Sequence, residues 1–306
     1  MSDKLTRSSF SLWMQAVRPF SFTASITPVL LGSALAYHEL GYLRPLYFVL
    51  AVLGGLLLHA GTNLVAEYFD FKVGADTLTT FGSSRILVEG LMKPPQVLVG
   101  GLVAFSISFL IGLFLAWKLG WVIVWLGLAG LIGGYYYTAH PFGYKYRALG
   151  EPLVFMLMGP LMVFGGYFVQ TGRVVWLPIW VSLPVGLLVA AILHANNLRD
   201  IPDDIRAGFK TIPILTGWAF TTWSYRLLLA TAYLSVVLMA ALKAAPWWTL
   251  LVMLTIPVSL KLYQAVARAE PLTPKALATL DIATAQLHFQ FGLALTIGFV
   301  VARLAG

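Results

Sequence analysis

The chain contains no cysteine and very little charge. Of its 306 residues, only 10% are Asp, Glu, Lys or Arg, whereas soluble domains carry about 25%. The lack of cysteine excludes disulfides, thiolate nucleophiles and iron–sulfur ligation. With only five scattered histidines, it also argues against zinc and other soft-site metals. The scarcity of charge excludes an ordinary soluble domain.

Long apolar runs take the place of the missing charge, and 59% of the residues are hydrophobic. Runs of 18 or more apolar residues are typical of membrane-spanning helices. We find nine, at roughly 20–37, 46–66, 97–117, 120–138, 151–170, 175–197, 220–242, 246–266 and 284–303. We therefore predict an all-α, polytopic membrane protein with one domain over residues 1–306. The first run lacks a signal-peptide cleavage site and is interpreted as a retained helix.

The basic residues are distributed unevenly between the two sides that nine spans define. Fifteen of the 20 Lys and Arg residues fall on the side of the N-terminus, and five fall on the other side. The positive-inside rule then places the N-terminus and the longer loops in the cytoplasm, and the C-terminus outside a cell membrane. This distribution explains the net charge of +8 without a nucleic-acid partner.

Two apolar runs on the basic side end in matched polar clusters. Asn63 precedes Glu67 by four residues and Asp70 by seven, and Asn196 precedes Asp200 by four and Asp204 by eight. Such spacings put the polar groups on one side of each helix. Half of the 12 acidic residues lie in these stretches: Glu67, Asp70, Asp76, Asp200, Asp203 and Asp204. Carboxylates at the end of a membrane helix are costly and call for a reason.

Crowded carboxylates and nearby bases allow two interpretations. The same loops carry Lys72, Arg85, Arg199, Arg206 and Lys210. The acids and bases either neutralise each other as ion pairs, or the acids hold magnesium while the bases hold an anion. A magnesium-bridged diphosphate satisfies both groups, because magnesium favours one or two carboxylates together with phosphate oxygens. In a membrane, this favours a lipid diphosphate, with Tyr135, Tyr136 and Tyr137 as candidates for lining its site.

The two clusters resemble a known pair of motifs. NLVAEYFDFKVGAD (63–76) and NNLRDIPDDIRAGFKTIPILTG (196–217) look like the aspartate-rich signatures of the UbiA-type membrane prenyltransferases. Their residues are most similar to those of the MenA branch, the 1,4-dihydroxy-2-naphthoate polyprenyltransferases. The resemblance runs in order over most of the chain. It implies nine helices around a central cavity, with polar cap loops over a cytoplasmic mouth.

The resemblance also implies magnesium, a polyprenyl diphosphate and roles for individual residues. The first metal group comprises Asn63, Glu67 and Asp70, with Asp76 as a further candidate. The second comprises Asn196, Asp200 and Asp204. Predicted substrate-binding residues are Arg18, Lys72, Arg85, Tyr137, Asn197 and Lys210. The family usually has Asp where this chain has Glu67, which leaves open whether Glu67 or Asp70 is the metal ligand. Asp203 stands next to Asp204, which leaves the register of the second motif open.

The implied reaction is ionisation of the allylic diphosphate, followed by attack of an electron-rich ring on the allylic cation. In the MenA-type reaction the ring loses CO2 and gives a demethylmenaquinol. His59 and His194 lie near the two motifs, but a lone histidine near a helix end is more often a packed residue. Other acceptors (4-hydroxybenzoate, homogentisate, a chlorophyllide or a glycerol phosphate ether), an ion-coupled transporter and an assembly protein are the alternatives. Acids gathered at one mouth disfavour the transporter.

Overall fold

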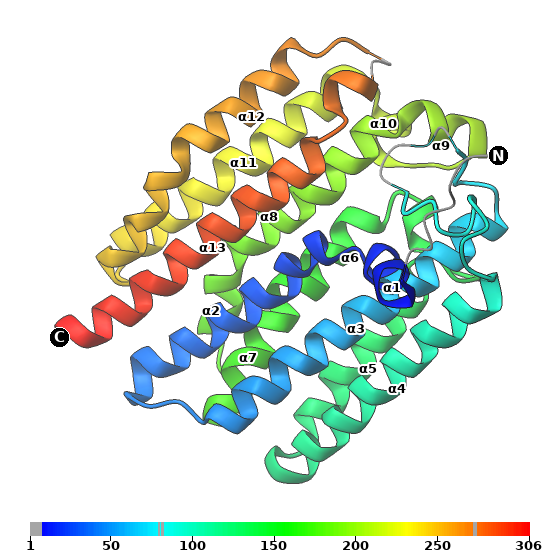
Figure 1. Ribbon diagram of the computed structural model, residues 1–306. Helices are drawn as coiled ribbons and strands as arrows, with labels where there is room; N and C mark the ends of the chain where they lie inside the picture. Colours follow the sequence, from blue (N-terminus) through cyan, green and yellow to red (C-terminus); the bar gives the residue numbers. More distant parts are fainter. Residues whose placement is uncertain (1–7, 79, 81–82, 272–273) are drawn as a thin grey trace.

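The computed structural model describes residues 8–78, 80, 83–271 and 274–306, which form a bundle of long, roughly parallel or antiparallel helices (Figure 1). Eight helical segments are long and apolar enough to cross a membrane: η1–α2 (Pro19–Leu40), α3 (Pro45–Lys72), α4 (Pro94–Leu119), α6–η3–α7 (Gly150–Thr171), α8 (Leu177–Arg199), α11 (Trp218–Ala241), η4–α12 (Trp247–Arg268) and α13 (Leu280–Ala305). The prediction of an all-α polytopic membrane protein is confirmed.

One of the nine predicted spans is shorter than expected. The run 120–138 forms the apolar helix α5 (Val122–Tyr135) of 14 residues, followed by turns rather than by a further helical turn. The three tyrosines predicted from the sequence therefore lie at and just beyond the end of this helix. Every predicted apolar run thus contains a helix, and one of them is too short to cross a bilayer by itself.

Short elements gather at one end of the bundle, which we call the site end. They are α1 (Ser9–Val17), η2 (Tyr144–Tyr146), α9 (Ile201–Ala207), α10 (Ile212–Thr216) and η5 (Pro274–Leu277). Figure 1 shows α1, α9 and α10 at this end, whereas α13 finishes at the opposite end. The loop after α5 and the loop after α9 meet there, because the backbone N–H of Lys210 donates to Tyr146 O at 3.1 Å.

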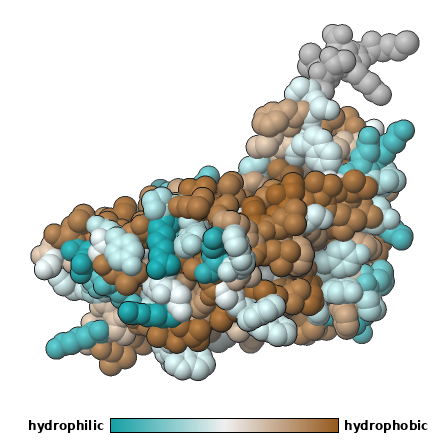
Figure 2. Space-filling view, turned by 90° about the horizontal axis from the view of Figure 1, so that it is seen from below, coloured by the Kyte–Doolittle hydropathy of each residue, from teal (hydrophilic) through white to brown (hydrophobic). Residues whose placement is uncertain are grey.

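Exposed tryptophans mark the end of the bundle opposite to the site end. Six of the seven tryptophans that are more than half exposed lie near the α4–α5, α7–α8 and α11–η4 connections: Trp117, Trp121, Trp125, Trp176, Trp180 and Trp247. The seventh, Trp223, lies near the start of α11 at the site end. Tryptophan is enriched where membrane meets water. In Figure 2 hydrophobic side chains cover the broad middle of the visible face, and hydrophilic ones gather toward its ends. Both features fit a bundle that spans a bilayer.

The span α6–η3–α7 is interrupted by a wide turn. Around Gly159 and Pro160 the helix takes a π-helical form over Leu157–Leu161, since proline lacks the N–H that a regular α-helix needs. A Cβ on Gly159 would lie only 2.7 Å from the Cα of Gly186, so glycine lets this turn press against α8. The turn thereby directs neighbouring side chains of the same segment into an internal cavity.

Candidate functional site

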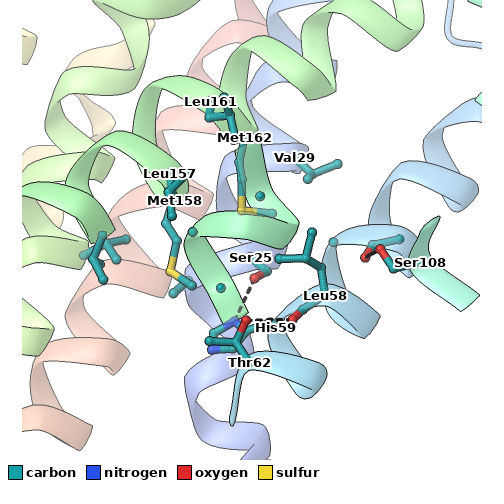
Figure 3. A pocket seen from close by; sticks show the side chains of 18 of the residues that line it. Ser25, Val29, Leu58, His59, Thr62, Ser108, Leu157, Met158, Leu161 and Met162 are labelled. Atoms are coloured by element: carbon teal, nitrogen blue, oxygen red, sulfur yellow. Dashed lines mark hydrogen bonds between the residues drawn. The ribbon is translucent and has the colours of Figure 1, made fainter. Parts of the chain in front are cut away.

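A cavity of about 340 Å³ opens inside the bundle, between α2, α3, α4, α5, the α6–η3–α7 span and α8. Its charged and amide lining groups are Arg18, Asn63, Asp70, Lys145, Asn196 and Asp281. The rest of the lining is mainly apolar, and Figure 3 shows Val29, Leu58, Leu157 and Met162 around the opening. From Asp70 to Leu50 the cavity follows twenty residues of α3, or about 30 Å. It is therefore long, with a polar mouth and an apolar interior.

The first acidic motif lies on the last turns of α3. Glu67 is fully buried, and its Oε2 accepts a hydrogen bond of 2.8 Å from Arg18 Nη2. Its second oxygen, Oε1, is buried without a hydrogen-bond partner. Arg18 sits at the junction of α1 and η1 with a left-handed backbone (φ 53°), which turns the chain over the mouth of the cavity. The observed partner of Glu67 is thus a base that the sequence predicts to bind diphosphate.

Asp70 is held by the loop that follows α5. Its Oδ2 accepts from Lys145 Nζ at 2.7 Å, and its Oδ1 accepts from the Tyr146 hydroxyl at 2.7 Å. Burial disfavours the charged lysine, but Asp70 outweighs this and raises the pKa of Lys145 above its usual value. The Tyr146 ring packs 4.3 Å from the ring of Phe209, which belongs to the cap that follows α9. Asp70 is thereby connected to elements of both cap loops.

Asn63 is oriented by the chain that precedes α2. Its Nδ2 donates to Val17 O at 2.8 Å and to Ser21 Oγ at 3.0 Å, so its carbonyl oxygen is the polar atom left for a ligand. One turn earlier on α3, His59 lies between two serines, with Nδ1 2.7 Å from Ser25 Oγ and Nε2 3.2 Å from Ser21 Oγ. Figure 3 shows His59 and Ser25 at the cavity wall. His59 is a hydrogen-bonded residue of the lining.

The second motif is built around a buried arginine. Arg199 ends α8, and its guanidinium donates to both carboxylate oxygens of Asp200, at 2.7 and 2.8 Å. The same group bonds Asn196 Oδ1 and forms an ion pair of 2.7 Å with Asp281 of α13. Asp204 follows on α9 and is buried. The guanidinium of Arg199 is therefore held between Asn196, Asp200 and Asp281.

The carboxylates of the two motifs influence each other through Lys145. Burial, with the nearby charge of Asp70, raises the pKa of Asp76 to about 6, and Lys145 opposes this rise. Burial also raises the pKa of Asp204 to about 7, against Lys145 and together with Asp200 and Asp70. Lys145 is thus close enough to both motifs to stabilise their ionised forms. The two motifs face one shared site.

The predicted site residues fall into two sets. Five line the cavity: Arg18, Asn63, Asp70, Tyr137 and Asn196. Four predicted metal ligands lie outside that lining: Glu67, Asp76, Asp200 and Asp204. Among the remaining substrate-binding predictions, Lys72 and Lys210 are exposed and Arg85 is half-buried. Asn197 points elsewhere, because its Nδ2 donates to Glu151 Oε1 at 2.9 Å beside His194.

Two residues of this site lie outside the predicted metal and substrate groups. From the sequence, Lys145 is one of several bases on the same side and, with Arg147 and Asn197, a candidate partner of the acceptor's carboxylate, whereas the structure pairs it with Asp70. Asp281 stands in the first turn of α13, where an acid is also explained by the helix dipole. Nothing in its sequence neighbourhood distinguishes this explanation from a role in the site. Its contact with Arg199 reveals the connection to the second motif.

The residues present fit a divalent cation that is shared with a phosphate ligand. Within the described residues, no group of three or more acidic or histidine side chains is arranged to hold a metal by itself. Buried carboxylate oxygens without partners are nevertheless found at Glu67 Oε1, Asp76 Oδ2 and Asp281 Oδ1. Magnesium typically uses one or two carboxylates plus substrate phosphates and water. This donor set is suited to such an ion.

The fold and the site define an intramembrane protein in which a mouth of paired acids and bases leads into a long apolar cavity. The model of the UbiA prenyltransferase family matches residues 25–301, and the chain belongs to this family. The family resemblance predicted from the two motifs is thereby confirmed. Prenyltransferases of the UbiA family are transferases, so the chain is a prenyltransferase of this family.

Similar proteins cover nearly the whole chain. A 1,4-dihydroxy-2-naphthoate octaprenyltransferase of Bacillus subtilis (strain 168) is 33% identical over 95% of this chain and 92% of its own. The human UbiA prenyltransferase domain-containing protein 1 is also 33% identical, over 97% and 85%. A structure of a UbiA homologue from Archaeoglobus fulgidus bound to GPP and Mg²⁺ aligns with a TM-score of 0.68 at 18% identity, covering 94% of this chain and all of that one.

Proposed function

We propose that the protein transfers a polyprenyl group from an allylic polyprenyl diphosphate to 1,4-dihydroxy-2-naphthoate, with loss of CO2, to give a demethylmenaquinol. The observation that carries this proposal is the meeting of Asp70 and Asn196, from two separate motifs, at the polar end of one long apolar cavity. This arrangement has a place for a charged head and a place for a hydrocarbon tail. The Bacillus relative supports the naphthoate as acceptor.

Magnesium would be held by the two motifs together with the diphosphate. The first group comprises Asn63, Glu67, Asp70 and Asp76, and the second comprises Asn196, Asp200 and Asp204. When bound, the ion stabilises the negative charge that grows on the leaving diphosphate. The Mg²⁺ in the homologue from Archaeoglobus fulgidus supports this assignment. Because no set of acids is complete by itself among the described residues, we infer that the ion and the diphosphate bind together.

Arg18 and Lys145 are positioned to bind the diphosphate head. Both line the cavity, and each is paired with a carboxylate of the first motif, at 2.8 and 2.7 Å. Cations that engage these carboxylates would free both bases to donate hydrogen bonds to phosphate oxygens, where charge-assisted bonds are strong. Tyr137 also lines the cavity, and its ring can stabilise an allylic cation through its face.

The apolar part of the cavity protects the reaction from water. The bond between C1 and the diphosphate oxygen breaks, and the ring carbon that bears the carboxyl group forms the new carbon–carbon bond. Water would trap the allylic cation if it had access, and a lining of Leu, Val and Met side chains excludes it. This chemistry needs no protein nucleophile.

The orientation that we propose puts the site end in the cytoplasm. The end with the two motifs carries most of the Lys and Arg residues, as the positive-inside rule requires for a cytoplasmic face. The opposite end carries most of the exposed tryptophans. Substrates would then be delivered from the cytoplasm and the lipid product released into the bilayer.

Turnover by the purified protein tests the proposal. The protein in detergent receives magnesium, octaprenyl diphosphate and a panel of acceptors that includes 1,4-dihydroxy-2-naphthoate, 4-hydroxybenzoate and homogentisate. We expect diphosphate release and a prenylated, decarboxylated naphthoate, with no product when EDTA removes the metal. Product with another acceptor alone would contradict the naphthoate assignment, and no product with any acceptor would contradict the enzymatic function.

A further inference from the structure

Arg199 is a buried charge that the reaction described above does not use. Its side chain is 1% exposed, although it stands in the last turn of α8 next to the polar end of the cavity. It contacts Asn196, Asp200 and Asp281 at the same time. A buried ion is strongly unfavourable without partners. Arg199 is therefore fixed in place by the second motif and by one residue of α13.

This arrangement creates an electrostatic conflict for cation binding at the second motif. If Asp200 alone neutralised Arg199, the pair would carry no net charge, and the guanidinium would repel a divalent cation. Asp281 lies on another side of the guanidinium, where its Oδ2 pairs with Nη1 at 2.7 Å. With both carboxylates ionised, the three side chains carry one net negative charge. Asp281 thus removes the conflict without displacing Arg199.

The second oxygen of Asp281 has no hydrogen-bond partner within the described part of the protein. The side chain is 8% exposed, Asp281 lines the cavity, and Oδ1 is buried without a partner. An unpaired buried carboxylate oxygen is costly, since it forgoes the hydrogen bonds that it makes in water. The cost is tolerated at a residue whose other oxygen holds Arg199 and whose charge lies beside the second motif.

We propose that Asp281 is a positioning residue of the second metal motif. It fixes Arg199, which orients Asn196 and Asp200, and it supplies the negative charge that leaves Asp200 able to bind a divalent cation. The inference rests on the proposed function, because it concerns the magnesium–diphosphate site of that reaction. Asp281 lies outside both acidic motifs, 81 positions after Asp200.

Binding of Mn²⁺ in the presence of inorganic diphosphate tests this inference without turnover. Affinity and stoichiometry are measured by electron paramagnetic resonance on the purified protein in detergent. For Asp281→Asn we expect a 10–100-fold loss of affinity at one class of sites, as is typical when a residue that supports metal ligands is changed. Asp281→Glu keeps the charge and should keep most of the affinity.

The double variant Arg199→Gln/Asp281→Asn separates electrostatics from simple packing. It restores the single net negative charge of the wild type. The Mn²⁺ affinity of the double variant should therefore be within a few fold of the wild-type affinity and higher than that of Asp281→Asn. A purely structural contact between α8 and α13 would make the double variant no better than the single one, which would overturn the proposal. This variant also decides the question if Asp281→Asn alone does not fold.

Glu39→Gln is the matched control, because it removes a carboxylate whose Oε2 accepts from the Tyr167 hydroxyl outside the cavity. Its Mn²⁺ affinity should equal that of the wild type. Equal binding by wild type and Asp281→Asn would overturn the inference while leaving the proposed function intact. If the wild type bound no Mn²⁺ with diphosphate, the proposed metal site itself would fail.

Discussion

Individual residues at the mouth of the cavity divide into those that touch the site and those that only share its loops. Lys145 and Lys72 illustrate the difference. Both are basic residues on the same side of the membrane, yet Lys145 Nζ bonds Asp70 inside the cavity. Lys72 is exposed, with Nζ 5.9 Å from the centre of the Tyr68 ring. Spacing along the chain does not reveal which base turns inward.

We expect Lys145→Gln to lower turnover by about 10²–10³-fold, the usual cost of removing one donor that stabilises developing negative charge. Lys72→Gln makes the same change at an exposed lysine and serves as the control, and its turnover should stay within a few fold of the wild type. Initial rates with saturating acceptor measure both variants. The reverse order of effects would contradict the role assigned to Lys145 and favour the prediction made from the sequence for Lys72.

The buried acids predict how cation binding depends on pH. Burial holds the pKa of Asp204 at about 7 and that of Asp76 at about 6, so both carry protons below these values. Cations compete with these protons, and Mn²⁺ affinity with diphosphate should fall as pH is lowered from about 8 to about 5.5. Diphosphate itself also titrates, so Asp204→Asn serves as the reference. Identical pH profiles for wild type and Asp204→Asn would contradict this account.

At the scale of elements, the shape of the cavity follows from where the helices carry glycine. Gly112 on α4 and Gly127 on α5 both line it, and a Cβ at either position would meet no atom within 4 Å. Both positions lie in the half of their helix that is remote from the polar mouth. Glycines nearer the mouth, such as Gly133 and Gly134, are already in contact with neighbouring side chains. The lining thus leaves room for added side chains at Gly112 and Gly127, where a long tail would end.

Filling this volume should change the length of donor that the enzyme accepts. We expect Gly112→Leu and Gly127→Leu to raise KM and lower kcat for octaprenyl diphosphate at least tenfold, while geranyl diphosphate is used as before. Overpacking a close-fitted site is unfavourable, but a short tail would not reach it. Ser106→Leu on the exposed face of α4 is the control. Equal losses with both donors would show that the cavity does not hold the tail.

Much of the helical pattern and half of the site were predictable from the sequence. Apolar runs set the spans, and the spacing of Asn63, Glu67 and Asp70 set one face of α3, because both depend on short-range periodicity. The short α5 was not foreseen, since the sequence stays apolar and aromatic after the helix has ended at Tyr135. The role of Asp281 depends on a contact between distant helices, which local patterns do not contain.

For the whole molecule, the arrangement of the ends determines where substrates meet. The two motifs, α1 and the cap elements share one end, and most of the exposed tryptophans share the other. In the proposed function, one cavity that runs between these ends holds both the charged head and the apolar tail of the donor. The same asymmetry predicts the orientation of the protein in its membrane.

Topology can be tested by thiol labelling, because the chain has no cysteine of its own. Glu89→Cys lies in an exposed turn at the site end, and Val174→Cys lies in an exposed connection at the opposite end. In intact cells, a membrane-impermeant maleimide should label Val174→Cys and spare Glu89→Cys until the membrane is opened. Labelling of Glu89→Cys alone in intact cells would reverse the proposed orientation.

The most direct test is a structure of the protein with Mn²⁺ and a non-hydrolysable polyprenyl diphosphate analogue, with the ions located by anomalous scattering. We predict manganese peaks between Asp70 and Asp200, the diphosphate against Arg18 and Lys145, and the tail along α3 toward Leu50. Manganese bound away from both motifs, or a tail outside this cavity, would contradict the account.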